Sequence, residues 1–497
     1  MTRDRYQHAI RRGAIYNLLG GIARLGYPLF LMLVARLWGS AFSGLFLLAQ
    51  ALVEVVACTV IDGPADATVV FASRHVDGAA DDERTRARLY HVLGTTARVA
   101  LGLGVPLAVA TVLLSGPLVR HFFPRYGELL PGLWLLAAAL IPRAISQTAI
   151  AATKALLHMQ YDALLNGFLY PVFLLAGGLA TWALGGGLTA LLGVQLLAEC
   201  GLTVLALRVA ARYFSLADVA RALRLPADRE VLRFVIPQGL NLTFNRYIAR
   251  VDSIMLAAFG LGRSDLGFFS TAAMLTGLLA QIRMVFSGAL APVVARYHAT
   301  GAREALEATM GRVARWSTGL AVPAVFIVLV FRADLLGLVS PDFRRTSLFV
   351  VVQLIPPFTS CAYGLAGASL MFTGHSRTTL ANSISVAVFN TGLVVVLVPR
   401  YGPMGAAVAT AIASSTMTAL QMIELFWLER VAIRWRYVRL PHLGLAAGLL
   451  PLILLWDPAR LSAAGRAGAA ALACGIYATV ELAGARLRRR QVLQPGG

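Results

Sequence analysis

Charged residues are scarce in this chain. Only 14% of its 497 residues are Asp, Glu, Lys or Arg, whereas a soluble domain of this length carries about 25%. Apolar residues make up 58%, and the mean hydropathy is +0.72. This composition excludes an ordinary soluble domain and indicates a polytopic membrane protein. The N-terminus lacks a small-residue cleavage site after a short apolar core, so we interpret it as a retained first helix.

Cysteine, histidine and lysine are also rare. The four cysteines fall in apolar segments without a pairing pattern, and the eight histidines are scattered, so we expect no metal and no other cofactor. Lys154 is the only lysine, yet abundant arginine brings the formal net charge to +20. These arginines stand mostly at the ends of apolar segments. Positive-inside topology and anionic headgroups explain them better than a nucleic-acid partner, which we do not expect.

The hydrocarbon core of a bilayer is about 30 Å thick. Fourteen apolar segments are long enough to cross it as tilted helices. The predicted fold class is therefore an all-α integral membrane protein with about 14 transmembrane helices. The expected limits are 13–38, 41–62, 89–114, 129–153, 162–184, 187–209, 231–259, 266–292, 312–331, 346–372, 378–399, 403–428, 440–457 and 464–485.

The distribution of basic residues tests this number of spans. With a cytoplasmic N-terminus, 28 basic residues lie at cytoplasmic ends and 10 at outer ends. A miscounted helix would scramble that bias, so it supports both the span number and cytoplasmic placement of both termini. The outer residues are Arg36, Arg120, Arg125, Arg263, Arg332, Arg344, Arg345, Arg400, Arg460 and Arg466.

The chain repeats itself at a constant offset. ARLWGSAFSGLF (35–46) aligns with AFGLGRSDLGFF (258–269), which makes Gly44 the equivalent of Gly267. Both copies start on the same side, so we predict a parallel duplication with two pseudo-symmetric six-helix lobes. The expected divisions are an N-terminal lobe at 1–228, a C-terminal lobe at 229–438, and an appended helix pair with a basic tail at 439–497.

A short segment between the lobes has the pattern of a surface helix. Ser215 and Asp218 look like a helix start, and Leu216, Val219 and Leu223 share one face with arginines opposite. We predict a helix lying on the cytoplasmic membrane surface. A solvated linker is the alternative.

Six arginines lie inside the spans. Each would cost about 2.5–3.5 kcal/mol near the centre of a lipid-facing helix, and together roughly 15–20 kcal/mol. That exceeds a typical folding stability of about 5–15 kcal/mol. Most must therefore face a wet cavity or an anionic partner. They are Arg24, Arg98, Arg143, Arg246, Arg250 and Arg283.

Acidic residues well inside the spans are fewer, which leaves positive charge in excess. A central cavity with excess arginine suits an anionic ligand, and arginine fits phosphate with two parallel hydrogen bonds. Asp252 either pairs with an arginine or carries a coupling proton or ion, and Glu54 poses the same choice. The acids concerned are Glu54, Glu199, Asp252 and Glu424.

For some of these arginines a structural role explains the position in a span as well as substrate binding does. Arg246 and Arg250 are one turn apart and share a face, and the duplication puts Arg24 at nearly the equivalent position of the first span. Arg98 can reach the cytoplasmic interface, and Arg143 can bind a carbonyl freed by Pro142. The candidate substrate-binding residues are Arg24, Arg246, Arg250, Arg283 and Arg143, with Asp252 and Glu54 as ion-coupling candidates.

Three stretches carry a resemblance to a known family. The first is LVARLWGSAFSGLFLLAQAL (33–52), and the second is VDSIMLAAFGLGRSDLGFFSTAAML (251–275), running on to ALAPVVARYHATG (289–301). The third is LVPRYGPMGAAVATAIA (397–413), preceded by SLMFTGHSRTTLANS (369–383). Their order and spacing resemble the polysaccharide (oligosaccharide) flippase family, O-antigen/exopolysaccharide type, of the multidrug/oligosaccharidyl-lipid/polysaccharide exporter superfamily. The resemblance covers about residues 10–430.

This resemblance implies a flippase and not an enzyme. Two lobes would surround a central cavity that opens to one side at a time. The cargo would be an oligosaccharide on a polyprenyl pyrophosphate, moved from the cytoplasmic to the outer leaflet of a bacterial inner membrane. The implied partners are this lipid-linked oligosaccharide, membrane lipids, and the polymerase and chain-length machinery of polysaccharide assembly.

Three alternatives stay open at this point. Lipid-linked peptidoglycan precursor flippases also have fourteen spans, but usually carry Asp-Ala-Phe-Phe where this chain has Ser43-Gly44-Leu45-Phe46. Drug/cation antiporters of the same superfamily favour acids in the first helix, where this chain has Arg24. Membrane polymerases and ligases carry a long outer loop with catalytic residues, and the outer loops here are short.

Overall fold

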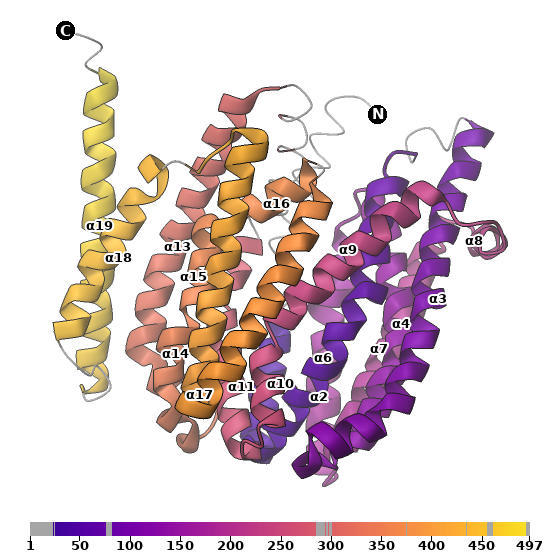
Figure 1. Ribbon diagram of the computed structural model, residues 1–497, viewed down its shortest axis with the longest axis horizontal. Coiled ribbons are helices and arrows are strands. Elements are labelled where there is room, and N and C mark those ends of the chain that lie inside the picture. The colour runs from indigo at the N-terminus through magenta and orange to yellow at the C-terminus, as the bar shows by residue number, and fades with distance from the viewer. Residues whose placement is uncertain are drawn as a thin grey trace. The chain divides into compact units, whose positions relative to one another are not determined.

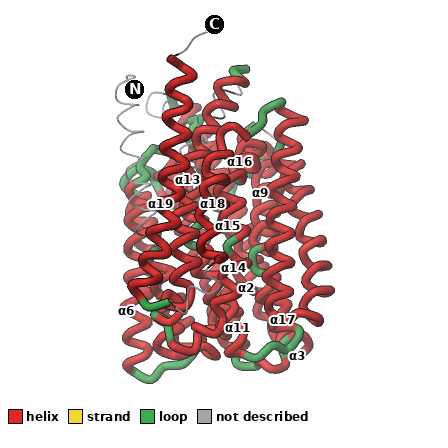
Figure 2. Tube along the Cα trace, turned by 90° about the vertical axis from the view of Figure 1, so that its left-hand side faces the viewer, coloured by secondary structure: helices red, strands yellow, loops and turns green. Residues whose placement is uncertain are grey.

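Helices account for nearly all of the described chain. The computed structural model describes residues 23, 25–75, 82–284, 294, 297, 301–373, 375–433, 435–454 and 461–493. Within them helices are joined by short loops and no strand is present, as Figure 2 shows. The all-α prediction is confirmed.

Nine of the described helices are long and apolar enough to cross a membrane, or ten if a bent pair is one span. The bent pair joins Ser347–Tyr363 to Leu365–Met371 at 54°. Two of the nine, α2 (Gly26–Ala72) and α17 (Ser376–Glu429), each contain two predicted spans. They break at Gly39 (φ 82°) and Gly402 (φ 58°), conformations that favour glycine, close to the expected boundaries. The described helices are compatible with fourteen spans.

Contacts divide the chain into two compact units. One is Met1–Ser270 with Ser383–Gly402, and the other is Thr271–Asn382 with Pro403–Gly497. These limits are not the predicted lobe limits. The lobe division at residues 228 and 438 stays a prediction.

The second predicted span is longer than expected. We placed its end at residue 62, but α2 continues to Ala72. Beyond Pro64 the buried residues Ala67 and Phe71 lie one turn apart and belong to a core cluster that also contains residues of α3 (Glu83–Phe122). This packing outweighs the local cost of the proline and keeps the segment helical.

In the first unit, α4 packs against α2, α3 and α7, and α6 packs against α2 and α7 (Figure 1). Helix α3 starts at Asp82, whose carboxylate accepts bonds from the Thr85 hydroxyl and from the amides of Arg84 and Thr85. These bonds lower the pKa of the exposed Asp82 carboxyl. The remaining elements of this part are η1 (Pro124–Tyr126), α4 (Leu129–Ala155), α5 (Gln160–Asp162), the π-helix η2 (Ala163–Leu169), α6 (Tyr170–Ala183), α7 (Leu188–Ala210) and α8 (Leu216–Ala222).

The predicted span 231–259 is not one helix. It consists of α9 (Arg229–Ile248) and α10 (Val251–Ala258), separated at Ala249 and Arg250. Helix α11 (Arg263–Gly277) follows after a turn at Gly260.

The repeated glycines meet in the first unit. A Cβ placed on Gly44 would lie 2.8 Å from the Gly267 nitrogen, and one placed on Gly267 would collide with the Ser40 carbonyl. Helices α2 and α11 therefore approach at backbone distance. Two residues that are equivalent in the repeat are thus neighbours in the fold, while the parallel duplication itself stays a prediction.

The second unit is built around α13 (Arg303–Gly337). Helices α18 (Trp435–Leu454) and α19 (Ala463–Leu493), the predicted appended pair, pack against each other and against α13. The shorter elements are η3 (Pro341–Thr346), α14 (Ser347–Gln353), α15 (Ile355–Tyr363) and α16 (Leu365–Phe372).

Two ion pairs hold α19 on α13. The Arg466 guanidinium contacts Asp334 with Nε at 2.8 Å and Nη2 at 3.1 Å, and Arg315 contacts Glu481 at 2.5 Å. Between them the Tyr477 hydroxyl donates to the Gly319 carbonyl at 3.0 Å.

We expect Arg466→Ala to destabilise the protein by about 2 kcal/mol, because it leaves the Asp334 carboxylate without its ion-pair partner. Thermal unfolding in detergent checks this. The double variant Arg466→Ala/Asp334→Ala should lose less than the sum of the two single variants. Strict additivity would mean that the pair contributes nothing.

Candidate functional site

The candidate site depends on a close crossing of α2 and α9. A Cβ on Gly239 would lie 3.0 Å from the Thr59 carbonyl oxygen, and one on Gly63 would lie 3.1 Å from the Gly239 Cα. The hydroxyls of Thr59 and Thr243 are 2.5 Å apart at the same crossing. Small residues at facing positions thus let the two backbones approach, as in other membrane helix pairs. This crossing brings Glu54 of α2 to the arginines of α9.

Glu54 lies between Arg246 and Arg250. The Arg246 Nη1 atom is 3.0 Å from Glu54 Oε1. Arg250 contacts the other carboxylate oxygen, Oε2, with Nη2 at 2.9 Å and Nε at 3.1 Å. Both arginines reach one carboxylate, although α9 ends between them at Ile248. We call these three residues the Glu54 cluster.

The Glu54 cluster keeps a net positive charge and stays accessible. One carboxylate faces two guanidinium groups, so one positive charge is left over. The side chains of Arg246 and Arg250 are 41% and 36% exposed, and that of Glu54 is 25% exposed. Each guanidinium has five N–H donors, of which Glu54 uses only one or two. The cluster therefore has N–H donors that an anion can use.

A second arginine–glutamate pair joins α4 to α7 in the same unit. The Arg143 Nε atom is 3.7 Å from Glu199 Oε1, with Arg143 41% exposed and Glu199 2% exposed. The Pro142 carbonyl accepts its hydrogen bond from the Thr203 hydroxyl at 2.6 Å. Arg143 therefore pairs with a buried acid.

The other predicted residues lie elsewhere. Arg24 is outside the described residues. Arg283 belongs to the second unit, where its side-chain stem lies against Gly364. Asp252 is 5% exposed and accepts a hydrogen bond from the Ser253 amide at 2.7 Å, at the start of α10. Within the described ranges Asp252 forms no ion pair, so the arginine pairing that we considered for it is not observed. Its coupling role stays a prediction.

The charge balance differs from the sequence-based expectation. Because α2 continues to Ala72, Asp62 and Asp66 are also within a helix, and the Asp66 carboxylate accepts a bond from Gln238 at 2.9 Å. Two acids beyond the four named from the sequence therefore lie on the helix that carries Glu54. The spacing of Asp62 and Asp66, four residues apart in a segment with continuing apolar periodicity, was the available signal.

A polar ladder along α4 was also missed. Lys154 contacts Asp162 at 3.1 Å, and Gln147 exchanges two hydrogen bonds with Asn166, at 2.9 and 3.0 Å. Asn166 also donates to Asp162 at 2.7 Å. Asp162 immediately precedes the π-helix that carries Asn166, and π-helical turns occur frequently at functional sites.

Buried amides join α9 to the first half of α17. Asn245 donates to Ser383 at 2.9 Å, and the Ser383 hydroxyl donates to Asn241 at 2.7 Å. Asn390 donates to the Ile248 carbonyl at 3.2 Å, next to the break before Arg250. Buried hydrogen-bonded groups of this kind rigidify the end of α9. They therefore help to position Arg250.

With this geometry in view, comparison with known proteins identifies the family. A family model described as "Polysaccharide biosynthesis protein" matches residues 91–340, just over half of the chain. The chain belongs to the polysaccharide biosynthesis protein family. The resemblance seen in the sequence, to a polysaccharide flippase of the multidrug/oligosaccharidyl-lipid/polysaccharide exporter superfamily, is confirmed.

One curated protein is similar to this chain over most of its length. It is the probable low-salt glycan biosynthesis flippase Agl15 of Haloferax volcanii, 25% identical over 435 residues, with 85% of this chain and 84% of the relative covered.

Two kinds of solved transporter share the fold. The lipid II flippase MurJ in an inward closed conformation has a TM-score of 0.72 at 12% identity, covering 97% of this chain and all of that one. An inward-facing multidrug resistance MATE family transporter has a TM-score of 0.62 at 16% identity, covering 84% and 94%. At these identities the similarity establishes the fold of a multi-pass membrane transporter.

Proposed function

We propose that this family member moves a polyprenyl-pyrophosphate-linked oligosaccharide from the cytoplasmic to the outer leaflet. The family assignment supports a role in polysaccharide biosynthesis, and the relative's name supports a glycan flippase. The fold is shared with a lipid II flippase and with a multidrug resistance transporter. With both termini cytoplasmic in the cell's inner membrane, the protein would supply the machinery that extends the surface polymer.

The Glu54 cluster is the observation that carries this proposal. A pyrophosphate presents several oxygens, and arginine binds such groups with two parallel hydrogen bonds. Arg246 on α9 and Arg250 at the break after it both contact Glu54 with donors left over, so they can bind neighbouring phosphate oxygens. Arg143 lies in the same unit, and Arg24 and Arg283 are proposed to join it in binding substrate.

Glu54 is proposed to link substrate binding to an ion. The carboxylate holds both guanidinium groups at 2.9–3.1 Å. A pyrophosphate would compete for the same donors, and a displaced carboxylate would take a proton or a cation. Asp252 is the second coupling candidate, buried at the start of α10 next to Arg250.

The fold alone does not separate this proposal from its nearest rivals, because both a lipid II flippase and multidrug transporters share it. Two observations favour a glycan cargo. The curated relative is named for glycan biosynthesis. The stretch Ser43-Gly44-Leu45-Phe46 departs from the pattern usual in peptidoglycan precursor flippases.

Deleting the gene tests the proposal. We expect mass spectrometry of polyprenyl-linked lipids to detect an accumulated pyrophosphate-linked oligosaccharide, and surface glycan to be lost, because the cargo is made but not moved. Wild-type protein should reverse both effects. Intact surface glycan without accumulation would contradict the proposal, and accumulated lipid II would favour the precursor flippase.

A further inference from the structure

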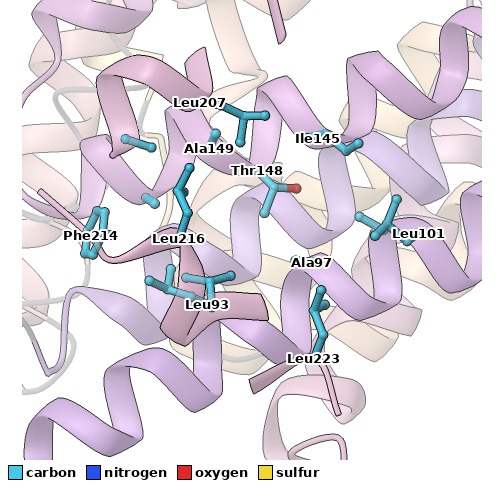
Figure 3. A pocket seen from close by; sticks show the side chains of 14 residues that line it. Leu93, Ala97, Leu101, Ile145, Thr148, Ala149, Leu207, Phe214, Leu216 and Leu223 are labelled. Atoms are coloured by element: carbon cyan, nitrogen blue, oxygen red, sulfur yellow. The ribbon is translucent and has the colours of Figure 1, made fainter. Parts of the chain in front are cut away.

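An apolar groove opens in the first unit away from the Glu54 cluster. Its floor is α4, which packs against both α3 and α7, and these two helices form its walls. Its volume is about 190 Å³. Figure 3 shows Leu101 of α3, Ile145 of α4 and Leu207 of α7 at the cavity. We call it the α3–α4–α7 groove.

Helix α8 closes one end of the α3–α4–α7 groove. Leu216, Val219 and Leu223, the shared face predicted from the sequence, all line it. The helix begins at Ser215, whose hydroxyl accepts a bond from the Asp218 amide at 3.3 Å. Arg98 of α3 donates to the Leu225 carbonyl just beyond α8 and so ties this closure to the wall. The short helix predicted between the lobes is present, and its apolar face is turned into the groove.

The lining excludes a sugar and suits a hydrocarbon chain. Thr148 is the only residue of the lining with a polar side chain, and its hydroxyl already donates to the Ala144 carbonyl at 2.8 Å. A glycan would leave its hydroxyls without partners there. Many of the lining residues are alanines, which make a slot between the larger side chains. They are Ala97, Ala100, Ala149, Ala152 and Ala210.

Positive charge gathers beside the closed end. Arg208 follows the lining residue Leu207, and Arg224 follows the lining residue Leu223; both arginines are exposed. Over residues 208–233 six arginines face only three acids. The predicted topology puts this end at the cytoplasmic interface, where anionic lipid headgroups lie.

We propose that the α3–α4–α7 groove binds an anionic phospholipid of the cytoplasmic leaflet. One acyl chain lies along α4 between α3 and α7, beneath the apolar face of α8, and the headgroup phosphate binds Arg208 and Arg224. Basic pockets between membrane helices on the cytoplasmic side are suited to such headgroups. The lipid fills a slot that would otherwise lack contacts and holds α8 against the first unit.

An unbranched acyl chain fits this slot better than a polyprenyl tail. A methyl branch at every isoprene unit widens the chain, and a groove of about 190 Å³ favours a narrow one. The occupant is therefore a resident lipid, distinct from the cargo of the proposed function.

Native mass spectrometry of the full-length protein in mild detergent tests this proposal. We expect dioleoyl phosphatidylglycerol to remain bound when dioleoyl phosphatidylcholine at the same concentration does not. Arg208→Gln and Arg224→Gln should each weaken phosphatidylglycerol binding about fivefold, since one arginine near a headgroup is worth about a tenfold change or less. Arg303→Gln, an exposed arginine at the start of α13 in the other unit, is the matched control and should change nothing.

Filling the groove gives an independent measurement. Ala149→Leu should abolish the bound phosphatidylglycerol, whereas Leu197→Phe, on α7 with 71% exposure and outside the groove, should not. If Ala149→Leu fails to fold, the two arginine variants decide.

Equal binding of both phospholipids, or unchanged binding in the double arginine variant, would overturn the proposal. Displacement of phosphatidylglycerol by polyprenyl phosphate would also overturn it, by making the groove a cargo site. Export is not the readout, so failure here leaves the proposed function unaffected.

Discussion

Arg250→Ala is expected to abolish export while the protein remains in the membrane at normal abundance. Arg250 contributes two donors to Glu54 from the break between α9 and α10. Losing a bidentate, charge-assisted contact to a pyrophosphate should reduce transport at least about 100-fold. Arg250→Lys should retain part of the activity, because the charge stays while the planar fork is lost. Accumulated polyprenyl-linked oligosaccharide and residual surface glycan are the measurements.

The matched control is Arg36→Ala. Arg36 is an exposed arginine on α2, the same helix as Glu54, and its loss should leave export intact. Arg246→Ala should reduce export, as Arg250→Ala does, and should not leave it intact as Arg36→Ala does. Normal export by the double variant Arg24→Ala/Arg250→Ala would contradict an arginine-dependent mechanism.

Gly267→Ala is expected to cost about 3 kcal/mol or more, the upper range for overpacking a close contact. The new Cβ would collide with the Ser40 carbonyl, and neither backbone can rotate away as a flexible side chain would. Gly44→Ala, the equivalent change in the first copy of the repeat, should be similarly destabilising because its Cβ would approach Gly267. Thermal unfolding in detergent and membrane abundance are the measurements.

Gly277→Ala in the same helix provides the comparison. A Cβ at Gly277 would meet no atom within 4 Å, and alanine favours a helix over glycine by about 1 kcal/mol. This variant should therefore be as stable as the wild type or more so. Wild-type stability of Gly267→Ala would refute a backbone-distance contact between α2 and α11.

Local patterns predicted much of the fold. Apolar length and arginine bias predicted the helices, and the breaks at Gly39 and Gly402 fall where span boundaries were expected. The end of α2 was wrong by ten residues, because packing of Phe71 against α3 overrides the proline and the two aspartates. The division of 231–259 at Arg250 carried no local signal, since neither glycine nor proline stands at the break.

The candidate site was predicted only in part. Spacing alone places Arg246 and Arg250 on one face, because the helical period is a property of the chain. Their shared partner Glu54 is almost 200 positions away, and no local pattern connects the two segments. The same holds for Arg143 with Glu199 and for Lys154 with Asp162, which depend on which helices lie side by side.

The sequence by itself determined that this protein is an all-helical membrane protein of a polysaccharide flippase type, with costly arginines in its spans. Composition and periodicity contain that information, because the bilayer imposes the same length and hydrophobicity on every span. Only the tertiary structure decided which acid forms an ion pair with which arginine. It also decided that the apolar face of α8 lines a groove. Those pairings depend on long-range packing, where facing glycines such as Gly63 and Gly239 let two helices approach and so select the partners.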